Sequence, residues 1–349
     1  MLVVLHHLGG AIAAPKYFSI PEFSIPFLFG HQSVLFFFVL SGFIIAYSHA
    51  ADFNRPSAFG PYLRKRLLRI YPLYWMLFIA VYAVASLSLG TSAGLPHDWR
   101  LLLKALLLVP LDVDEVGGTG APVLVVAWSL QYEIAFYMFA GLFILNRYVG
   151  CAALAALLLV FVSCVGGCRF PGQFFGSDFV LLFAIGVFGG LLTRRYSRIR
   201  GDALLASVSA GVLVVLAVVE IPWRGIASTV QHHLVQGLAS GVLIVALAAL
   251  ERRGRTPLHN SFLTRLGDAS YALYLMHYPI ISVLCKLLVA IFPLGLYGAL
   301  SAYALILLVC IASALLAHRW IERPLLAYLG SIFGSQGRRA SVTAKGASH

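Results

Sequence analysis

The clearest candidate for chemistry is a single carboxylate in an otherwise uncharged apolar stretch. Glu133 lies in VAWSLQYEIAFYM, residues 126–138, and between Glu115 and Arg147 no other residue carries a full charge. A lone acid at the centre of a membrane costs at least about 2.5 kcal/mol, so we expect Glu133 to be neutral, hydrogen-bonded or beside a wet cavity. The stretch alone leaves two interpretations equally open: a functional acid, or a side chain that only links helices through Ser, Tyr or Arg partners.

Two adjacent histidines, His6 and His7, lie in the first apolar segment, residues 1–14. Imidazole has an unperturbed pKa of about 6.5, which suits it to take a proton from a hydroxyl at neutral pH. Because histidine is rare inside membranes, the pattern favours a general base over a simple hydrogen bond between helices. A carboxylate such as Glu133 would then orient the imidazole or accept its charge.

Two arginines three residues apart, Arg66 and Arg69, share one face of a helix in RKRLLRI. Such a pair binds phosphate groups well, because each guanidinium offers two parallel donors. Taken alone, the motif is better explained as an anchor at the inner membrane surface, where lysine would serve equally. Phosphate binding is the alternative.

The segment LGDASYALYLMHYPII, residues 266–281, carries tyrosines at i, i+3 and i+7 of one helical face: Tyr271, Tyr274 and Tyr278. The simple account of these rings is an aromatic belt at the membrane surface. Near the ends of other apolar runs lie Asp178 and Glu220, which we expect to be solvated. Glu322 and Arg323 precede Pro324, a pattern that ends a helix.

Composition places these residues in a polytopic membrane protein. Of the 349 residues, 60% are hydrophobic and 11% are charged, and the mean hydropathy is +0.91, whereas about 25% of residues in soluble proteins are charged. The net charge of +12 gathers in short basic clusters between apolar runs, as the positive-inside rule expects, so we predict a lipid bilayer and no nucleic acid as partner. The clusters are Arg64, Lys65, Arg66 and Arg69; Arg194, Arg195, Arg198 and Arg200; and Arg252, Arg253 and Arg255.

The five cysteines are scattered through apolar segments and form no metal-like cluster, so we predict no metal site. Cys164 and Cys168 lie four residues apart. A disulfide or a metal pair is open for them, but the pattern favours an inert pair on one helical face.

The apolar runs predict an all-α bundle of about ten spans. After the first segment, 1–14, they cover 33–50, 71–89, 123–146, 151–167, 174–193, 203–221, 226–250, 269–292 and 294–318. Residues 101–111 are too short to cross and are predicted to be re-entrant or interfacial. With that assignment all the basic clusters lie on one side and both termini are cytoplasmic. We therefore expect one transmembrane domain, 1–330, and a basic, disordered cytoplasmic tail, 331–349. The first segment is also too short for a core of about 30 Å, so we expect residues upstream of Met1.

Six stretches in order resemble motifs of the acyltransferase 3 family of bacterial integral membrane acyltransferases. VVLHHL is similar to the family's first-helix pattern and aligns His7 with its essential histidine. SVLFFFVLSGFII, with Ser41 and Gly42, resembles its second helix. RKRLLRIYPLYW matches through Arg66 and Arg69. The remaining matches are AWSLQYEIAFY, with Trp128, Ser129 and Glu133; LGDASYALYLMHYPI, with Tyr274 and His277; and IERP, with Glu322 and Arg323.

The resemblance implies ten membrane helices in a bacterial cytoplasmic (inner) membrane. It implies transfer of an acyl group, usually acetyl, from cytoplasmic acetyl-CoA to a hydroxyl of a surface or exported carbohydrate or glycolipid. His7 would be the general base and Glu133 its partner or a second acid/base, while Arg66 and Arg69 would bind the donor's phosphates. The other motif residues would support the site: Ser41, Gly42, Trp128, Ser129, Tyr274, His277, Glu322 and Arg323. We expect acceptor selectivity in two outer loops, 112–122 and 166–177.

One departure and two alternatives stay open. The family's first motif has an arginine eleven positions before the histidine, which falls before Met1, so either the start lies upstream or this copy is impaired. The main alternative is a proton-coupled transporter or exporter of a glycan or a lipid-linked precursor, with His7, Glu133 and His277 as its proton path; the sequence shows no inverted repeat to favour it. A catalytically silent scaffold is the other.

Overall fold

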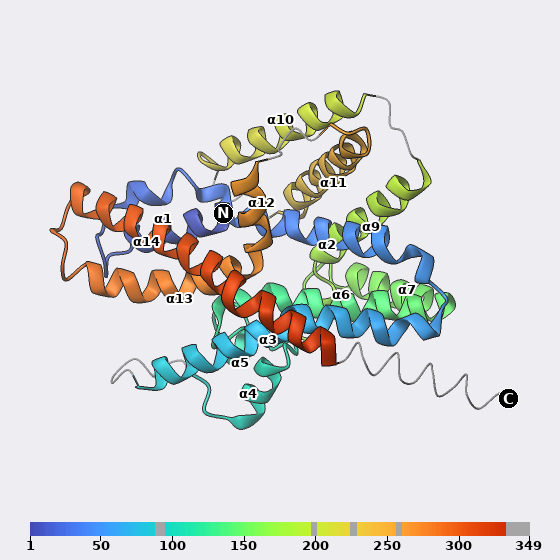
Figure 1. Ribbon diagram of the computed structural model, residues 1–349, viewed down its shortest axis with the longest axis horizontal. Helices are drawn as coiled ribbons and strands as arrows, with labels where there is room; N and C mark the ends of the chain where they lie inside the picture. The colour runs from blue at the N-terminus through green and yellow to red at the C-terminus, as the bar shows by residue number, and fades with distance from the viewer. Residues whose placement is uncertain (88–94, 197–200, 224–228, 256–259, 333–349) are drawn as a thin grey trace.

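The computed structural model describes residues 1–87, 95–196, 201–223, 229–255 and 260–332, and within these ranges the regular structure is helical (Figure 1). Eight helical segments in these ranges are long and apolar enough to cross a membrane, and α1 and α7 are apolar but shorter. The predicted polytopic helical bundle is confirmed, and a count of ten spans depends on those two shorter helices. The ten are α1 (Leu2–Ala13), α2 (Ser33–His49), α3 (Pro56–Leu87), α6 (Trp128–Leu145), α7 (Arg147–Ser163), α9 (Phe179–Arg195), α10 (Asp202–Glu220), α11 (Val230–Arg252), α13 (Ser270–Leu288) and α14 (Leu296–Ala317).

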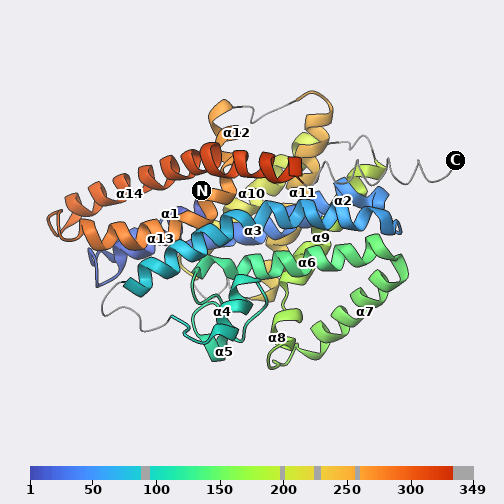
Figure 2. The same cartoon turned by 60° about the horizontal axis from the view of Figure 1, so that its bottom comes forward.

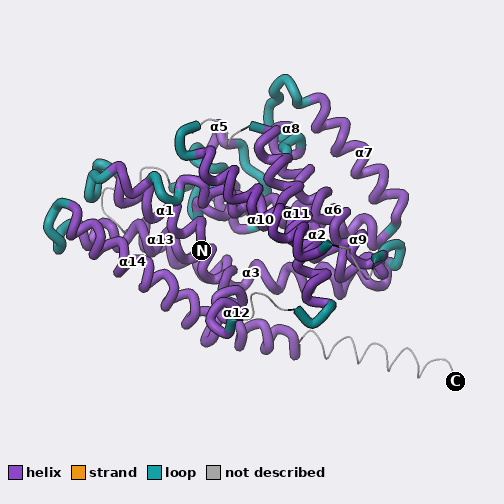
Figure 3. The backbone as a smooth tube through the Cα atoms, turned by 90° about the horizontal axis from the view of Figure 1, so that it is seen from above, coloured by secondary structure: helices purple, strands orange, loops and turns teal. Residues whose placement is uncertain are grey.

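The helices form two neighbouring groups. Helices α1, α13 and α14 pack on one another, and α2, α9, α10 and α11 form the second group, with α6 packed against α3 and α7. The loops gather towards the ends of the helices (Figure 3). Outward-facing positions on α10 expose large apolar side chains, including Leu204, Val208 and Val215, as a lipid-facing helix should.

Close approach of α2 to α9 depends on glycine. A side chain at Gly42 would overlap the backbone oxygen of Phe183, and side chains at Gly186 and Gly190 would overlap backbone oxygens of α2. Small residues allow such contact between membrane helices, where packing rather than the hydrophobic effect drives association. Gly42 is therefore a point of close contact between α2 and α9.

Helix α3 is longer than expected. We predicted a span over 71–89, but one helix runs from Pro56 to Leu87 and includes Pro61 and Pro72. Its 32 residues reach about 48 Å, so its first turns extend beyond a core of about 30 Å. Prolines are tolerated in such helices because neighbouring elements satisfy the freed backbone groups.

The short segment predicted not to cross forms α4 (Trp99–Leu106), beside α5 (Val113–Val116) (Figure 2). The Asp98 side chain caps α4 by accepting from the Arg100 amide at 2.8 Å. Helix α3 satisfies the carbonyls at its other end, where they lack partners within the helix. The donors are Tyr71 to Leu107 O at 2.7 Å, Tyr74 to Ala105 O at 2.7 Å and Trp75 to Leu106 O at 2.9 Å.

The expectation of an inert cysteine pair is wrong. Cys164 and Cys168 form a disulfide, with Cα atoms 5.0 Å apart. Helix α7 ends at Ser163, so the two residues lie in the turn that follows it and not on one helical face. The turn leads into α8 (Gly172–Phe175).

The expected helix end at Pro324 is also wrong. After α14 the chain makes a π-helical turn, His318–Glu322, and continues as helix to residue 332. A hydrogen bond of 2.8 Å between His318 Nδ1 and Glu322 Oε2 closes that turn. Of the predicted tail, residues 333–349 lie outside the described residues, as do Arg198 and Arg200.

Candidate active site

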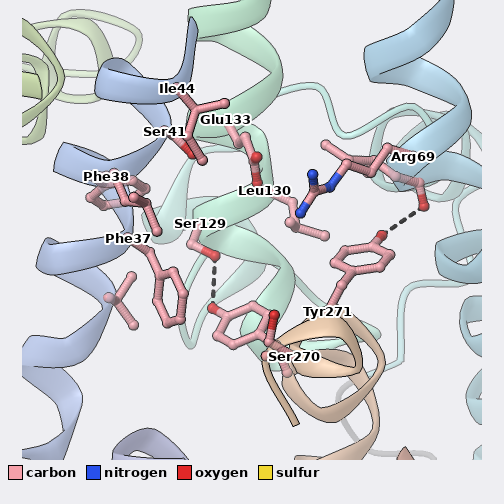
Figure 4. A pocket seen from close by; sticks show the side chains of 15 residues that line it. Phe37, Phe38, Ser41, Ile44, Arg69, Ser129, Leu130, Glu133, Ser270 and Tyr271 are labelled. Atoms are coloured by element: carbon pink, nitrogen blue, oxygen red, sulfur yellow. Dashed lines mark hydrogen bonds between the residues drawn. The ribbon is translucent and has the colours of Figure 1, made fainter. Parts of the chain in front are cut away.

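One cavity of about 280 Å³ contains the lone carboxylate and lies among α2, α3, α6, α13 and the preceding α12 (Ser261–Asp268). We call it the Glu133 cavity. Figure 4 shows the Glu133 and Arg69 side chains entering the same space from two helices. Its polar lining is Ser41, Arg69, Ser129, Glu133, Ser270, Tyr271 and Tyr274.

Glu133 has the surroundings that its burial requires. The Tyr137 hydroxyl, one turn further along α6, donates a hydrogen bond to Glu133 Oε1. The positive charges of Arg69 and Arg66 also act on this carboxylate. Glu133 is thus hydrogen-bonded and beside a cavity, as expected. Tyr137 was not singled out as a site residue, although the i, i+4 spacing to Glu133 would have found it.

The two arginines have different surroundings. Arg69 lines the Glu133 cavity. Arg66 is only 7% exposed, and its guanidinium lies 5.9 Å from the Tyr62 ring and 5.4 Å from the Tyr137 ring. Among the residues that the structure describes, its Nε has no hydrogen-bond partner. A surface anchor does not describe a guanidinium buried between two aromatic rings, where cation–π attraction holds it. Of the pair, Arg69 is the one placed to bind a ligand in the cavity.

A second cavity, of about 300 Å³, contains His7, and we call it the His7 cavity. His7 and Glu133 line different cavities, so the structure does not bring this pair into direct contact. The hydrogen-bond partner of His7 is His277, with His7 Nδ1 lying 2.9 Å from His277 Nε2. The polar lining of the His7 cavity is His6, His7, Lys16, Tyr17, Tyr278 and Ser282.

The hydrogen bonds assign the protons on the two imidazoles in their neutral forms. His277 Nδ1 lies 3.1 Å from the Leu273 carbonyl, which only accepts, so this nitrogen carries the proton. His277 Nε2 is then an acceptor, and His7 must donate to it from Nδ1. The lone pair of His7 therefore resides on Nε2, the tautomer of a general base.

Tyr274 and Ser129 line the Glu133 cavity, and Tyr274 lies near His277, the hydrogen-bond partner of His7. The Tyr274 hydroxyl is 2.7 Å from Ser129 Oγ and donates to Val126 O at 2.9 Å, and its ring lies 5.9 Å from that of His277. Tyr271 donates to Ile70 O at 2.6 Å. An aromatic belt at the membrane surface is therefore the wrong account of Tyr271 and Tyr274, because both hydroxyls join helices inside the protein.

Five predicted supporting residues line neither cavity: His277, described above, and Gly42, Trp128, Glu322 and Arg323. Trp128 packs against Phe38, with ring centroids 6.1 Å apart, and Gly42 serves the contact between α2 and α9. Glu322 is buried against His318, whereas Arg323 is exposed. Trp128, Gly42 and Glu322 therefore support the fold around the site.

The expectation that Glu220 and Asp178 are solvated is wrong. Glu220 is 1% exposed, accepts from the Gln32 amide and lies 3.5 Å from His31 Nδ1. Asp178 Oδ2 lies 2.5 Å from His233 Nδ1. These pairs could not be predicted from the sequence, because the two partners of each pair belong to distant segments of the chain.

A family model described as an acyltransferase domain, acyltransferase 3, matches residues 1–319. The chain belongs to the acyltransferase 3 family. It is similar to the acyltransferase MdmB of Streptomyces mycarofaciens, with 30% identity over 339 residues, 86% of this chain and 82% of that protein. It is also similar to the exopolysaccharide production protein ExoZ of Rhizobium meliloti, with 29% identity over 331 residues, 91% of this chain and 94% of that protein. No solved structure matches.

The arrangement fits a membrane acyltransferase. Acyl transfer to a hydroxyl requires a base for the hydroxyl proton and a cation for an acidic donor. In this acyltransferase 3 protein, His7 Nε2 is the candidate base and Arg69 the candidate cation, and the two lie in separate cavities.

Proposed function

We propose that this protein is an O-acyltransferase that moves an acyl group, in the simplest case acetyl, from cytoplasmic acyl-CoA to a hydroxyl of a surface or exported carbohydrate or glycolipid. The observation that carries the proposal is a pair of cavities, one lined by Arg69 and Glu133 and the other by His7, whose Nδ1 lies 2.9 Å from His277 Nε2. Each cavity offers the chemistry that one of the two substrates needs.

The donor is assigned to the Glu133 cavity. Arg69 offers a guanidinium to the phosphates of CoA, which is a polyanion. Gly267 and Ser270 also line this cavity, and they lie where α12 leads into α13, beyond the basic end of α11 that holds Arg252 and Arg253. The positive-inside rule places that end in the cytoplasm, where acyl-CoA is available.

The acceptor is assigned to the His7 cavity. Its hydroxyl would give its proton to His7 Nε2 as the oxygen attacks the thioester carbon, and the released thiolate takes up a proton, so that one ester and one thiol result. One relative is an exopolysaccharide production protein, which supports a carbohydrate as this acceptor. Tyr274 lines the Glu133 cavity and its ring lies 5.9 Å from that of His277, the partner of His7, so we expect the thioester arm of the donor to pass Tyr274 on its way to the hydroxyl.

The basic clusters also indicate how the protein is oriented in its membrane. We place the protein in the bacterial cytoplasmic membrane with both termini in the cytoplasm, because the basic clusters then share the inner side. The His7 cavity then lies towards the outer side, where an exported glycan arrives.

The deciding experiment measures transfer of radiolabelled acetyl from acetyl-CoA to the surface glycan of the host, with the purified protein in proteoliposomes. We expect His7→Ala and Glu133→Gln to abolish transfer while the protein remains inserted and folded. Arg323→Gln is the matched control, since this arginine is exposed and lines neither cavity. Retained transfer by a folded His7→Ala protein would reject the proposal, and proton-coupled flux of the glycan without any acyl transfer would favour a transporter.

A further inference from the structure

The His7 cavity contains a cation that the proposed chemistry does not use. Lys16 lines this cavity together with His7, Tyr278 and Ser282. Among the described residues that line the cavity there is no carboxylate. In the described part of the chain, Lys16 makes no ion pair, and its Nζ lies 5.1 Å from the centroid of the Tyr17 ring. The cavity is therefore positively charged at its rim and has no internal counterion.

The backbone holds this cation in place. Helix α1 ends at Ala13, and the Tyr17 amide donates to Ala14 O at 2.9 Å, which closes a tight turn around Lys16. The two residues after Lys16, Tyr17 and Phe18, are 8% and 4% exposed and fasten the turn to the core. Because the backbone of this turn is fixed, only the lysine side chain can move, and its charge stays beside the cavity.

We infer that the acceptor carries a negative charge close to the acylated hydroxyl, and that Lys16 binds this charge. The inference rests on the proposed function, since it assigns the acceptor to the His7 cavity. A carboxylate or phosphate on the acceptor would pair with the ammonium, while hydroxyls of Tyr278 and Ser282 and the imidazole of His6 bind the sugar's polar groups. Lys16 is a specificity residue in this scheme and takes no part in the proton transfer.

The size of the effect follows from the exposure of the lysine. An ion pair at a solvent-accessible rim changes affinity by up to about fivefold, and salt weakens it. We therefore expect a preference of about fivefold in KM for an anionic acceptor over a neutral acceptor of the same shape, and a smaller preference at high ionic strength.

The test uses octyl β-glucuronide and octyl β-glucoside, which differ only at C6, a carboxylate in the first and a hydroxymethyl group in the second, with the protein in nanodiscs of zwitterionic lipid. Transfer from acetyl-CoA gives KM for each acceptor, and equilibrium dialysis of the labelled glycosides gives binding without any need for activity. We expect native protein to prefer the glucuronide, Lys16→Arg to keep the preference and Lys16→Met to lose it. Lys286→Met is the matched control, because this lysine is exposed on α13 beyond Ser282 and does not line the cavity.

The outcomes separate the inference from the proposed function. Lys16-dependent glucuronide binding without transfer to either glycoside would support the anionic site and contradict the proposed acyl transfer. Equal binding of the two glycosides, or a preference that survives Lys16→Met, would overturn the inference even if transfer is observed. If phosphatidylglycerol in the nanodiscs removes the Lys16-dependent binding, the cation belongs to a lipid headgroup and the inference is wrong.

Discussion

Replacing His277 tests whether the imidazole pair sets up the base. His277 is fully buried, and its Nε2 accepts from His7 Nδ1 at 2.9 Å. Leucine has a similar size but no acceptor, so His277→Leu leaves the His7 N–H without a partner and frees the ring to adopt the other tautomer. Glutamine keeps an acceptor oxygen within reach of the same position.

The expected magnitude comes from the lost hydrogen bond. A buried donor left unsatisfied costs about 1–3 kcal/mol, which corresponds to about 5- to 150-fold in rate. We predict that His277→Leu lowers kcat/KM for the acceptor by an amount in that range and that His277→Gln lowers it less than fivefold. The KM for acetyl-CoA should stay unchanged in both, because His277 does not line the Glu133 cavity.

The assay is initial-rate transfer of labelled acetyl with varied acceptor and then varied donor, with thermal unfolding of each variant as the stability control. A folded His277→Leu protein with kcat/KM within twofold of native would refute the assignment of tautomers. So would a His277→Gln protein as inactive as His277→Leu, since the acceptor atom would then be irrelevant.

Three further predictions concern the cavities and the helix packing. Gly10 lines the His7 cavity, and a Cβ atom added there meets no described atom within 4 Å. Gly10→Leu should therefore fill the space and cut transfer more than tenfold without loss of stability. The control is Gly211→Leu at an exposed glycine in α10, and an equal loss of transfer in that variant would contradict the prediction. Arg69→Gln should raise KM for acetyl-CoA by about tenfold and leave KM for the acceptor unchanged, and an unchanged donor KM in steady-state kinetics would remove Arg69 from the donor site. Gly42→Ala should lower the unfolding temperature, because the added methyl overlaps Phe183 O and overpacking costs about 1–3 kcal/mol; an unchanged unfolding temperature would show that α9 shifts freely.

Local patterns in the sequence determined the bundle and part of the site. Long uncharged runs predict membrane helices because a spanning segment must satisfy its own backbone, and α2, α10 and α14 follow these runs closely. The isolation of Glu133 predicted a hydrogen-bonded acid beside a cavity, since an unpaired charge in a membrane is costly. The short run 101–111 predicted an element that does not cross, observed as α4.

Contacts between distant segments were decided only by the tertiary structure. His7 and His277 are 270 residues apart, so no local spacing could show that His277 orients His7 or that Glu133 lies in another cavity. Gln32 and Glu220 are 188 residues apart, which is why a buried acid looked like a solvated helix end. Arg66 and Arg69 have the same residue type and nearly the same helical face, yet Tyr62 and Tyr137 enclose one and leave the other at the cavity. Sequence fixes which side chains are available and which local faces they share, whereas packing between helices decides which of them meet.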